Sequence, residues 1–254
     1  MRADRKSAAV VGRRWTAASG RAVMPPNNDK RHREKRIMGS LYSAEHLALQ
    51  DEFGSTKLAG FLDEHHVTDA LSDKDAAFVA ARDYFFLSTV DPEGMPTVSY
   101  KGGPVGAVKV LGPNALAFPG FDGNGMFYSM GNVAGQAKVG LLFIDFETPH
   151  RLRVQGTARV EREDPLIGAW PEAKYVVRVD VTKAWVNCPR YIHKHVRVET
   201  SKYVPEAGKT TPLAAWKRLD IVQDALPQEE RARAESEGLL DLPSYEAKLV
   251  TGDA

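Results

Sequence analysis

Apolar and polar positions alternate in short runs from residue 84 to residue 160. The clearest case is the stretch from Arg151 to Val160, where apolar side chains fall on one face and arginine, glutamine and threonine on the other. A side-chain period of two predicts a half-buried β-strand. Gly, Pro, Asp and Asn separate the runs and predict turns. The strands expected are 83–90, 95–100, 105–111, 115–118, 139–146, 151–160 and 174–186. This pattern predicts a compact antiparallel barrel.

Helical periods flank and interrupt the strand pattern. Ser72 is a good N-cap, and Asp75 three residues later takes the place of the capping-box Glu. Helices are expected in two pieces over 43–62, from Ser72 to 81, over 126–138, from 211 to 221 and from 227 to 233. Residues 241–254 are expected to form an extended tail. The fold class predicted is mainly β with peripheral helices.

The N-terminal residues 1–37 differ in composition from the rest of the chain. They hold eleven Lys and Arg but only three Asp and Glu, and the pair Pro25-Pro26 breaks any periodicity. Such a segment is predicted to be disordered. A translation start at Met24 or Met38, a transit peptide and a nucleic-acid-binding tail are alternative interpretations. The domains expected are a basic extension at 1–37, a barrel domain at 38–200 and a helical extension at 201–254.

The overall charge and cysteine usage narrow the choice of partners. The 254 residues contain 34 Lys and Arg against 33 Asp and Glu, so the net charge of +1 gives no general attraction to nucleic acid or to anionic membranes. No apolar run is long enough to span a bilayer. Cys188 is the only cysteine, which excludes an intrachain disulfide and fits a reducing cytoplasm. We therefore expect a cytoplasmic protein with neither a nucleic-acid nor a membrane partner.

The loop from Pro119 to Gly125 is the most suggestive place for chemistry. Its three glycines, Asp122 and Asn124 leave backbone amides uncovered just before an expected helix, and both features attract anions. The loop lacks the lysine of a P-loop, and its glycine spacing is not that of a dinucleotide-binding fold. A phosphate site and a plain turn both remain open. The arginines of the 151–160 strand likewise either face solvent or border an anionic ligand.

Other reactive side chains give weaker signals. Cys188 has no base beside it in the sequence, so a nucleophilic role is not favoured. His193 and His195 would share one face of an extended segment, but no third ligand is evident. We expect no metal site.

Five sequence runs occur in an order that resembles a known family. They are FFLSTVDPEGMP at 85–96, YKGGPVG at 100–106, VLGPNALAFPGFDGN at 110–124, SMGN at 129–132 and VGLLFIDF at 139–146. Together they resemble the pyridoxamine 5'-phosphate oxidase-like proteins with the FMN-binding split barrel, over residues 41–198. The resemblance implies a six-stranded antiparallel Greek-key split barrel that forms a homodimer, with FMN in a groove at the subunit interface.

The resemblance also implies which residues contact the flavin. Lys109 and the 119–124 loop fall at the phosphate and ribityl chain, and Arg151 falls where the second subunit reaches the ring. Arg153, from the polar face of the same strand, is a candidate to border an anionic ligand. Trp185 and Arg190 would stack on and pair with the flavin across the dimer. The candidates are Lys101, Gly102, Gly103, Lys109, Pro119, Gly120, Asp122, Gly123, Asn124, Ser129, Asn132, Arg151, Arg153, Trp185 and Arg190. The chain departs from the family at 123–125, where Gly-Asn-Gly replaces a Ser-Arg-Lys phosphate clamp.

The function expected from this resemblance is an FMN-dependent oxidoreductase acting on a small molecule. The flavin takes a hydride at N5, so the protein needs to bind, orient and tune it. This fits a chain without an evident catalytic triad. The alternatives are a non-catalytic flavin or haem carrier or sensor, and a reductase that uses the deazaflavin F420.

Overall fold

The computed structural model describes residues 41–254, so the predicted disordered extension at 1–37 lies outside the described residues. The chain divides into two compact units, Met1–Thr56 and Lys57–Ala254. In the first unit, α2 (Ala44–Glu52) is the described helix. The domain boundaries expected from the sequence remain a prediction. None of the helices within 41–254 has the length and hydropathy of a membrane span.

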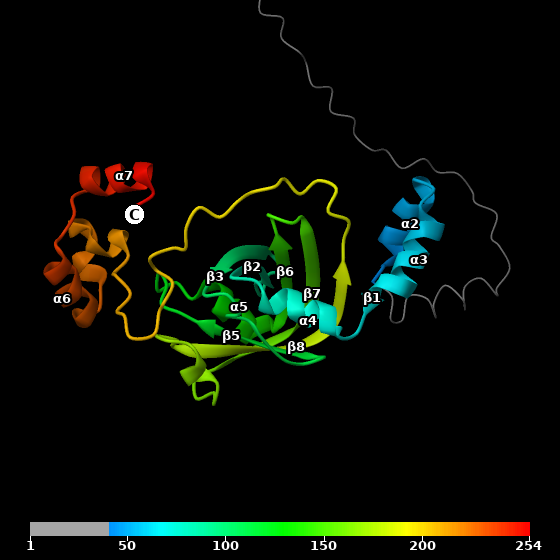
Figure 1. Cartoon of the computed structure of the whole chain (residues 1–254), viewed down its shortest axis with the longest axis horizontal. Coiled ribbons are helices and arrows are strands. Elements are labelled where there is room, and N and C mark those ends of the chain that lie inside the picture. The colour runs from blue at the N-terminus through cyan, green and yellow to red at the C-terminus, as the bar shows by residue number, and fades with distance from the viewer. Residues whose placement is uncertain (1–40) are drawn as a thin grey trace, which may run out of the picture. The chain divides into compact units, whose positions relative to one another are not determined.

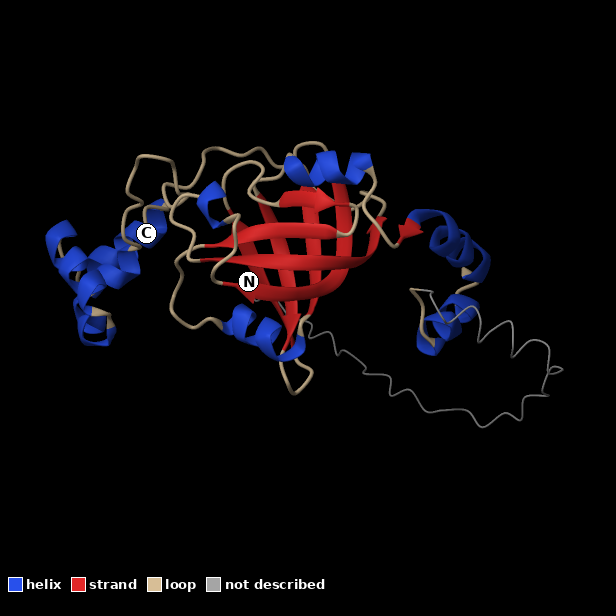
Figure 2. Cartoon of the chain, turned by 90° about the horizontal axis from the view of Figure 1, so that it is seen from below, coloured by secondary structure: helices blue, strands red, loops and turns tan. Residues whose placement is uncertain are grey.

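One antiparallel sheet of eight strands forms the second unit, in the order β3-β2-β6-β7-β8-β5-β4, with β1 paired to β8. The strands are β1 (Val67–Thr68), β2 (Tyr84–Val90), β3 (Pro96–Gly102), β4 (Lys109–Gly112), β5 (Ala115–Gly120), β6 (Lys138–Asp145), β7 (His150–Glu161) and β8 (Tyr175–Val186). Figure 2 shows the sheet curving so that one set of strands runs across the other. The predicted class, mainly antiparallel β with peripheral helices, is confirmed.

The helices after α2 are α3 (Thr56–His66), α4 (Asp73–Ala80), α5 (Tyr128–Gln136), α6 (Gln228–Glu237) and α7 (Leu242–Thr251), with the 3-10 helices η1 (Ile167–Ala169), η2 (Ala215–Arg218) and η3 (Asp220–Ala225). Of these, α4 and α5 pack on the sheet (Figure 1). The predicted cap of α4 is confirmed, because Ser72 Oγ accepts from Asp75 N at 3.2 Å and Asp75 accepts from Ser72 N at 3.0 Å.

Four details differ from the sequence expectations. Eight strands are found, whereas the sequence pattern predicts seven and the family resemblance implies six; β1 is the strand that the pattern does not predict. Residues 105–108 form a loop rather than the start of a strand, because Gly106 has φ +76° and its amide donates to Arg82 O. The expected helix at 211–221 is two 3-10 helices. The expected tail is α7, which Asp241 caps by accepting from Ser244 N.

The core lies on the inner face of the curved sheet. Leu152, Val154 and Ala158 of β7 point inward with Val177 and Val179 of β8, as the alternation predicted. The ladder between β7 and β8 shifts register at Gly156, where an added Cβ would stand 2.3 Å from Asp180 O. Only glycine permits so close an approach of the two backbones.

The connection from β5 to β6 positions the site. These two strands are consecutive in sequence but not neighbours in the sheet, and α5 joins them. Met130 and Val133 bury one face of α5 against β2 and β7. The glycine-rich loop and the first turn of α5 are thereby brought to the same place as the end of β3.

Candidate functional site

A cavity of about 630 Å³ lies between the end of β3, the loop after β5 and the start of α5. This volume is in the usual range for sites that hold a cofactor-sized ligand. Nine of the fifteen candidate residues line it: Lys101, Gly102, Gly103, Pro119, Gly120, Asp122, Gly123, Asn124 and Ser129. The structure thus brings two sequence segments predicted as ligand-binding, 101–103 and 119–124, into one cavity.

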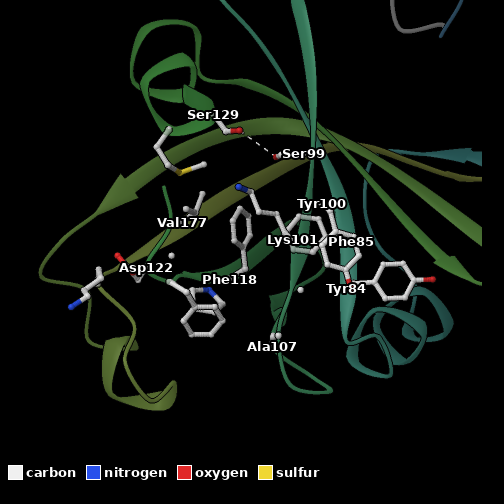
Figure 3. Close-up of a pocket in the computed structure, with 18 of the residues that line it drawn as sticks. Tyr84, Phe85, Ser99, Tyr100, Lys101, Ala107, Phe118, Asp122, Ser129 and Val177 are labelled. Carbon is white, nitrogen blue, oxygen red and sulfur yellow. Dashed lines mark hydrogen bonds between the residues drawn. The ribbon is translucent and has the colours of Figure 1, made fainter. Parts of the chain in front are cut away.

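Lys101 supplies a cation inside this cavity. It lies opposite Phe85 in the β2–β3 ladder, and Figure 3 shows its side chain reaching into the cavity. Burial lowers the pKa of its ammonium group. Within residues 41–254 its Nζ has neither a carboxylate partner nor a hydrogen-bond acceptor. An unpaired, partly desolvated ammonium group favours an anionic ligand.

The glycine-rich loop supplies backbone donors. In the described part of the chain, the amides of Gly123 and Asn124 have no acceptor. The loop leads into α5, whose N-cap Phe127 has φ +48° and makes no side-chain capping bond. The first amides of α5 are therefore also without a cap, and they add the positive end of the helix dipole. Ser129 in this first turn donates to Ser99 Oγ at 3.2 Å (Figure 3).

Gly120 fixes where the loop begins. A Cβ on Gly120 would lie 1.9 Å from the ring of Tyr175, which is much closer than atoms can approach. The backbone of the loop therefore passes directly over this ring, and Lys174 N donates to Gly120 O at 2.8 Å. The glycine at this position is required by packing, which the sequence pattern alone did not distinguish from a ligand-binding role.

Tyrosines form the opposite part of the lining. Tyr84 and Tyr100 stack with ring centroids 5.4 Å apart, and the Tyr84 hydroxyl donates to Ile144 O at 3.0 Å. Burial raises the pKa of Tyr84 to about 12 and also raises the pKa of Tyr100 and Tyr175. All three phenols remain neutral near pH 7. Aromatic faces of this kind suit a planar ligand ring.

Asp122 lines the cavity and is also paired with the C-terminal segment, residues 201–254. Its carboxylate accepts from Lys217 Nζ at 2.7 Å. Lys217, which lies 95 positions away, is not among the residues predicted from the sequence. A signal was available: Leu213, Ala215 and Leu219 alternate with it, and all four are buried. Tyr203, also outside the selected residues, lines the cavity as well.

The remaining six candidates do not line the cavity of their own chain. Asn132 is buried and donates to Thr89 Oγ1 at 3.1 Å, so it belongs to the packing of α5 on β2. Lys109 lies over the ring of Trp170, with Nζ 5.4 Å from the centroid. Arg151 donates to Cys188 O at 2.9 Å.

Arg153 and Trp185 are register partners in the β7–β8 ladder, and Arg190 is exposed after β8. A single chain therefore does not bring this group to the cavity.

An antiparallel barrel with a cavity beside a glycine-rich loop is an arrangement typical of β domains that bind small molecules. Residues 71–188 match the family model described as pyridoxamine 5'-phosphate oxidase. The match spans 118 of the 254 residues and confirms the resemblance seen in the sequence. The match covers β2 to β8 and ends at Cys188.

Several solved structures are similar in fold. HupZ from Group A Streptococcus is 18% identical, with 46% of this chain and 93% of that chain covered and a TM-score of 0.38. An FMN-binding protein from Syntrophomonas wolfei is 13% identical, with 55% and 97% covered and a TM-score of 0.37. HutZ, the haem storage protein of Vibrio cholerae, is 19% identical, with 46% and 94% covered and a TM-score of 0.36. Likenesses this distant support no inference about the ligand of this chain. A comparison with curated proteins gave no match.

Proposed function

We propose that the cavity binds FMN and that the protein is an FMN-dependent oxidoreductase for a small molecule. One observation carries the proposal: Lys101 places an unpaired cation in the cavity that the glycine-rich loop also lines. A phosphate that accepts from Lys101 and from the amides of Gly123 and Asn124 would satisfy donors that have no acceptor in the described residues. Charge-assisted bonds of this type are the strong ones in protein sites.

The remaining lining suits the rest of the ligand. FMN, when bound, supplies hydride transfer through N5. Tyr84 and Tyr100 offer a stacked, neutral aromatic surface, and Tyr175 with Tyr203 adds apolar area that excludes water. The role of these side chains is to bind, orient and shield.

We further propose that the protein works as a homodimer in the cytoplasm. The six candidates outside the cavity lie on β4, α5, β7, β8 and the segment after β8. Arg151 and Trp185 of a second subunit would then complete the ring-binding side of the cavity. Support for this is indirect: these side chains have no role in the cavity of their own chain. The single cysteine, which is exposed, fits a reducing compartment.

The alternative is a carrier or sensor that binds flavin or haem without turnover. The observation that favours a flavin carrier is that the described residues lining the cavity include no His, the side chain used most often as a general acid or base. F420 in place of FMN remains a third possibility from the sequence resemblance.

The test begins with the full-length protein as purified. The bound chromophore is extracted, and its absorption spectrum and mass are measured. The stripped protein is then titrated with FMN, riboflavin, F420 and haem. A flavin mass with tighter binding of FMN than of riboflavin supports the proposal. Binding of haem or F420 in preference to FMN overturns the cofactor. A flavoprotein that neither NADH nor NADPH reduces favours the carrier.

A further inference from the structure

The C-terminal segment contacts the cavity loop through an ion-pair network whose central lysine is buried. We call Asp122, Lys217 and Glu230 the Lys217 triad. Lys217 Nζ donates to Asp122 at 2.7 Å and to Glu230 at 2.8 Å, and the side chain of Lys217 is only 4% exposed. Asp122 belongs to the glycine-rich loop, Lys217 to η2 and Glu230 to α6. The triad therefore joins the barrel to the segment that follows it.

Hydrogen bonds and packing within the C-terminal segment fix the position of Lys217 independently of Asp122. Its carbonyl accepts from Gln223 Nε2 at 3.0 Å, and the neighbouring Arg218 donates to Gly238 O and Glu237 O at 2.7 and 2.6 Å. Leu213, Ala215 and Leu219 are buried around it. Burial by itself would lower the pKa of Lys217, but the hydrogen bonds and charges of Asp122 and Glu230 outweigh burial and raise the pKa. The ammonium group stays charged.

Asp122 would otherwise oppose the proposed ligand. It is adjacent to Gly123 and Asn124, whose amides are offered to the phosphate, and a carboxylate beside a phosphate is repelled by it. The ion pair turns the carboxylate toward Lys217 and compensates its charge. The same bond restrains the loop from the side of the C-terminal segment.

We propose that Lys217 is a positioning residue for the anion site: by pairing with Asp122 it neutralises and orders the glycine-rich loop, so the C-terminal segment is part of the ligand-binding unit. This inference rests on the proposed binding of FMN. It adds that the pairing of Lys217 with Asp122 is one source of the affinity for the FMN phosphate. The family match ends at Cys188, before this segment begins. The role proposed for the C-terminal segment therefore concerns residues outside the part of the chain that the family model matches.

The experiment uses charge arithmetic in the full-length protein. The triad carries one net negative charge, Lys217→Met raises it to two, and adding Asp122→Asn returns it to one. We expect Lys217→Met to weaken FMN binding about tenfold and riboflavin binding much less, because riboflavin has no phosphate. The double variant should recover most of the FMN affinity. Lys209→Met is the matched control, since Lys209 is an exposed lysine of the same segment.

A second measurement does not depend on ligand. Amide hydrogen exchange of residues 119–125 in the ligand-free protein should be faster in Lys217→Met than in the wild type or in Lys217→Arg. Equal loss of FMN and riboflavin binding without rescue by Asp122→Asn would show a general disruption and overturn the inference. Wild-type affinity and exchange in Lys217→Met would also overturn it. If the wild type binds no flavin, the proposed function itself fails, and the exchange measurement still decides whether Lys217 orders the loop.

Discussion

Lys101 in the cavity wall and Lys217 in the C-terminal segment are both lysines withdrawn from water, and they differ in how their charge is compensated. Lys217 has two carboxylates at hydrogen-bond distance, which raise its pKa despite burial. Lys101 has none within residues 41–254, and burial lowers its pKa. Removing one partner of a buried ion pair leaves a charge uncompensated, whereas an unpaired cation beside free amides suits an anionic ligand. The comparison distinguishes Lys217, which we propose positions the loop, from Lys101, which we propose binds the anion.

The largest effect is expected from removing the unpaired cation. Lys101→Met should weaken FMN binding about 100-fold, because one charge-assisted phosphate contact contributes roughly 2 to 3 kcal/mol. Its effect on riboflavin binding should be small. Isothermal titration of the stripped protein with both ligands measures the difference.

Lys101→Arg is the control that keeps the charge, and it should retain most of the FMN affinity. Equal losses for FMN and riboflavin in Lys101→Met would mean that Lys101 contacts the ring or shapes the cavity. The comparison between the two lysines would then lose its basis.

The packing of the glycine-rich loop on Tyr175 can be disrupted by substituting Gly120. Gly120→Ala places a Cβ against the Tyr175 ring, and we expect the free energy of unfolding to fall by about 2 kcal/mol, since the ring or the loop must move. Gly123→Ala is the matched control: its Cβ meets nothing within 4 Å, and we expect a change of at most about 0.5 kcal/mol. Urea unfolding of both variants gives the two values. A Gly120→Ala protein as stable as the wild type would show that the loop is not held against Tyr175.

Substitution of each of the two lysines should also affect the free energy of unfolding differently. Lys217→Met leaves Asp122 and Glu230 unpaired, and because both carboxylates are partly exposed we expect a loss of only about 1 to 2 kcal/mol. Lys101→Met removes a charge without a protein partner, so the ligand-free protein should be no less stable than the wild type. Denaturant unfolding without flavin tests both. Loss of stability in Lys101→Met would reveal a partner for Lys101 in the ligand-free protein.

Local signals in the sequence predicted most of the barrel. The period of two in β7 and the capping box at Ser72 depend on neighbouring residues, and both are present as expected. The loop 119–124 and the segment 101–103 were selected and share one cavity. These features can be predicted from the sequence because each is determined by a few adjacent side chains.

What could not be predicted depends on contacts between distant segments. The ion pair of Asp122 with Lys217 spans 95 positions, and the packing of Tyr175 on Gly120 spans two strands. The eight-strand count was missed because β1 has two residues, which gives no period to detect. The prediction of an extended tail was wrong, since Asp241, Pro243 and Ser244 form a helix-start signal and Asp241 caps α7.

The smallest effect is a loss of stability at high pH that comes from the ionisation of Tyr84, one of the tyrosines that line the cavity. Tyr84 has a folded-state pKa of about 12, above the ordinary value of 10.0, because burial disfavours the phenolate. The folded state therefore keeps a proton that the unfolded state releases, and the stability contributed by Tyr84 is lost as pH rises from about 10 to 12. The slope should be below roughly 1.4 kcal/mol per pH unit, since the ring is only half-buried and solvent screens its charge.

Tyr84→Phe isolates this contribution. The variant loses the bond to Ile144 O and should be about 1 kcal/mol less stable at pH 7. Because phenylalanine does not titrate, the difference from the wild type should shrink between pH 10 and 12, while Tyr175 affects both proteins equally. Unfolding free energies at pH 8, 10 and about 11 measure the trend. A difference that stays constant would mean that Tyr84 titrates at the same pH whether folded or unfolded, and that its hydroxyl reaches water.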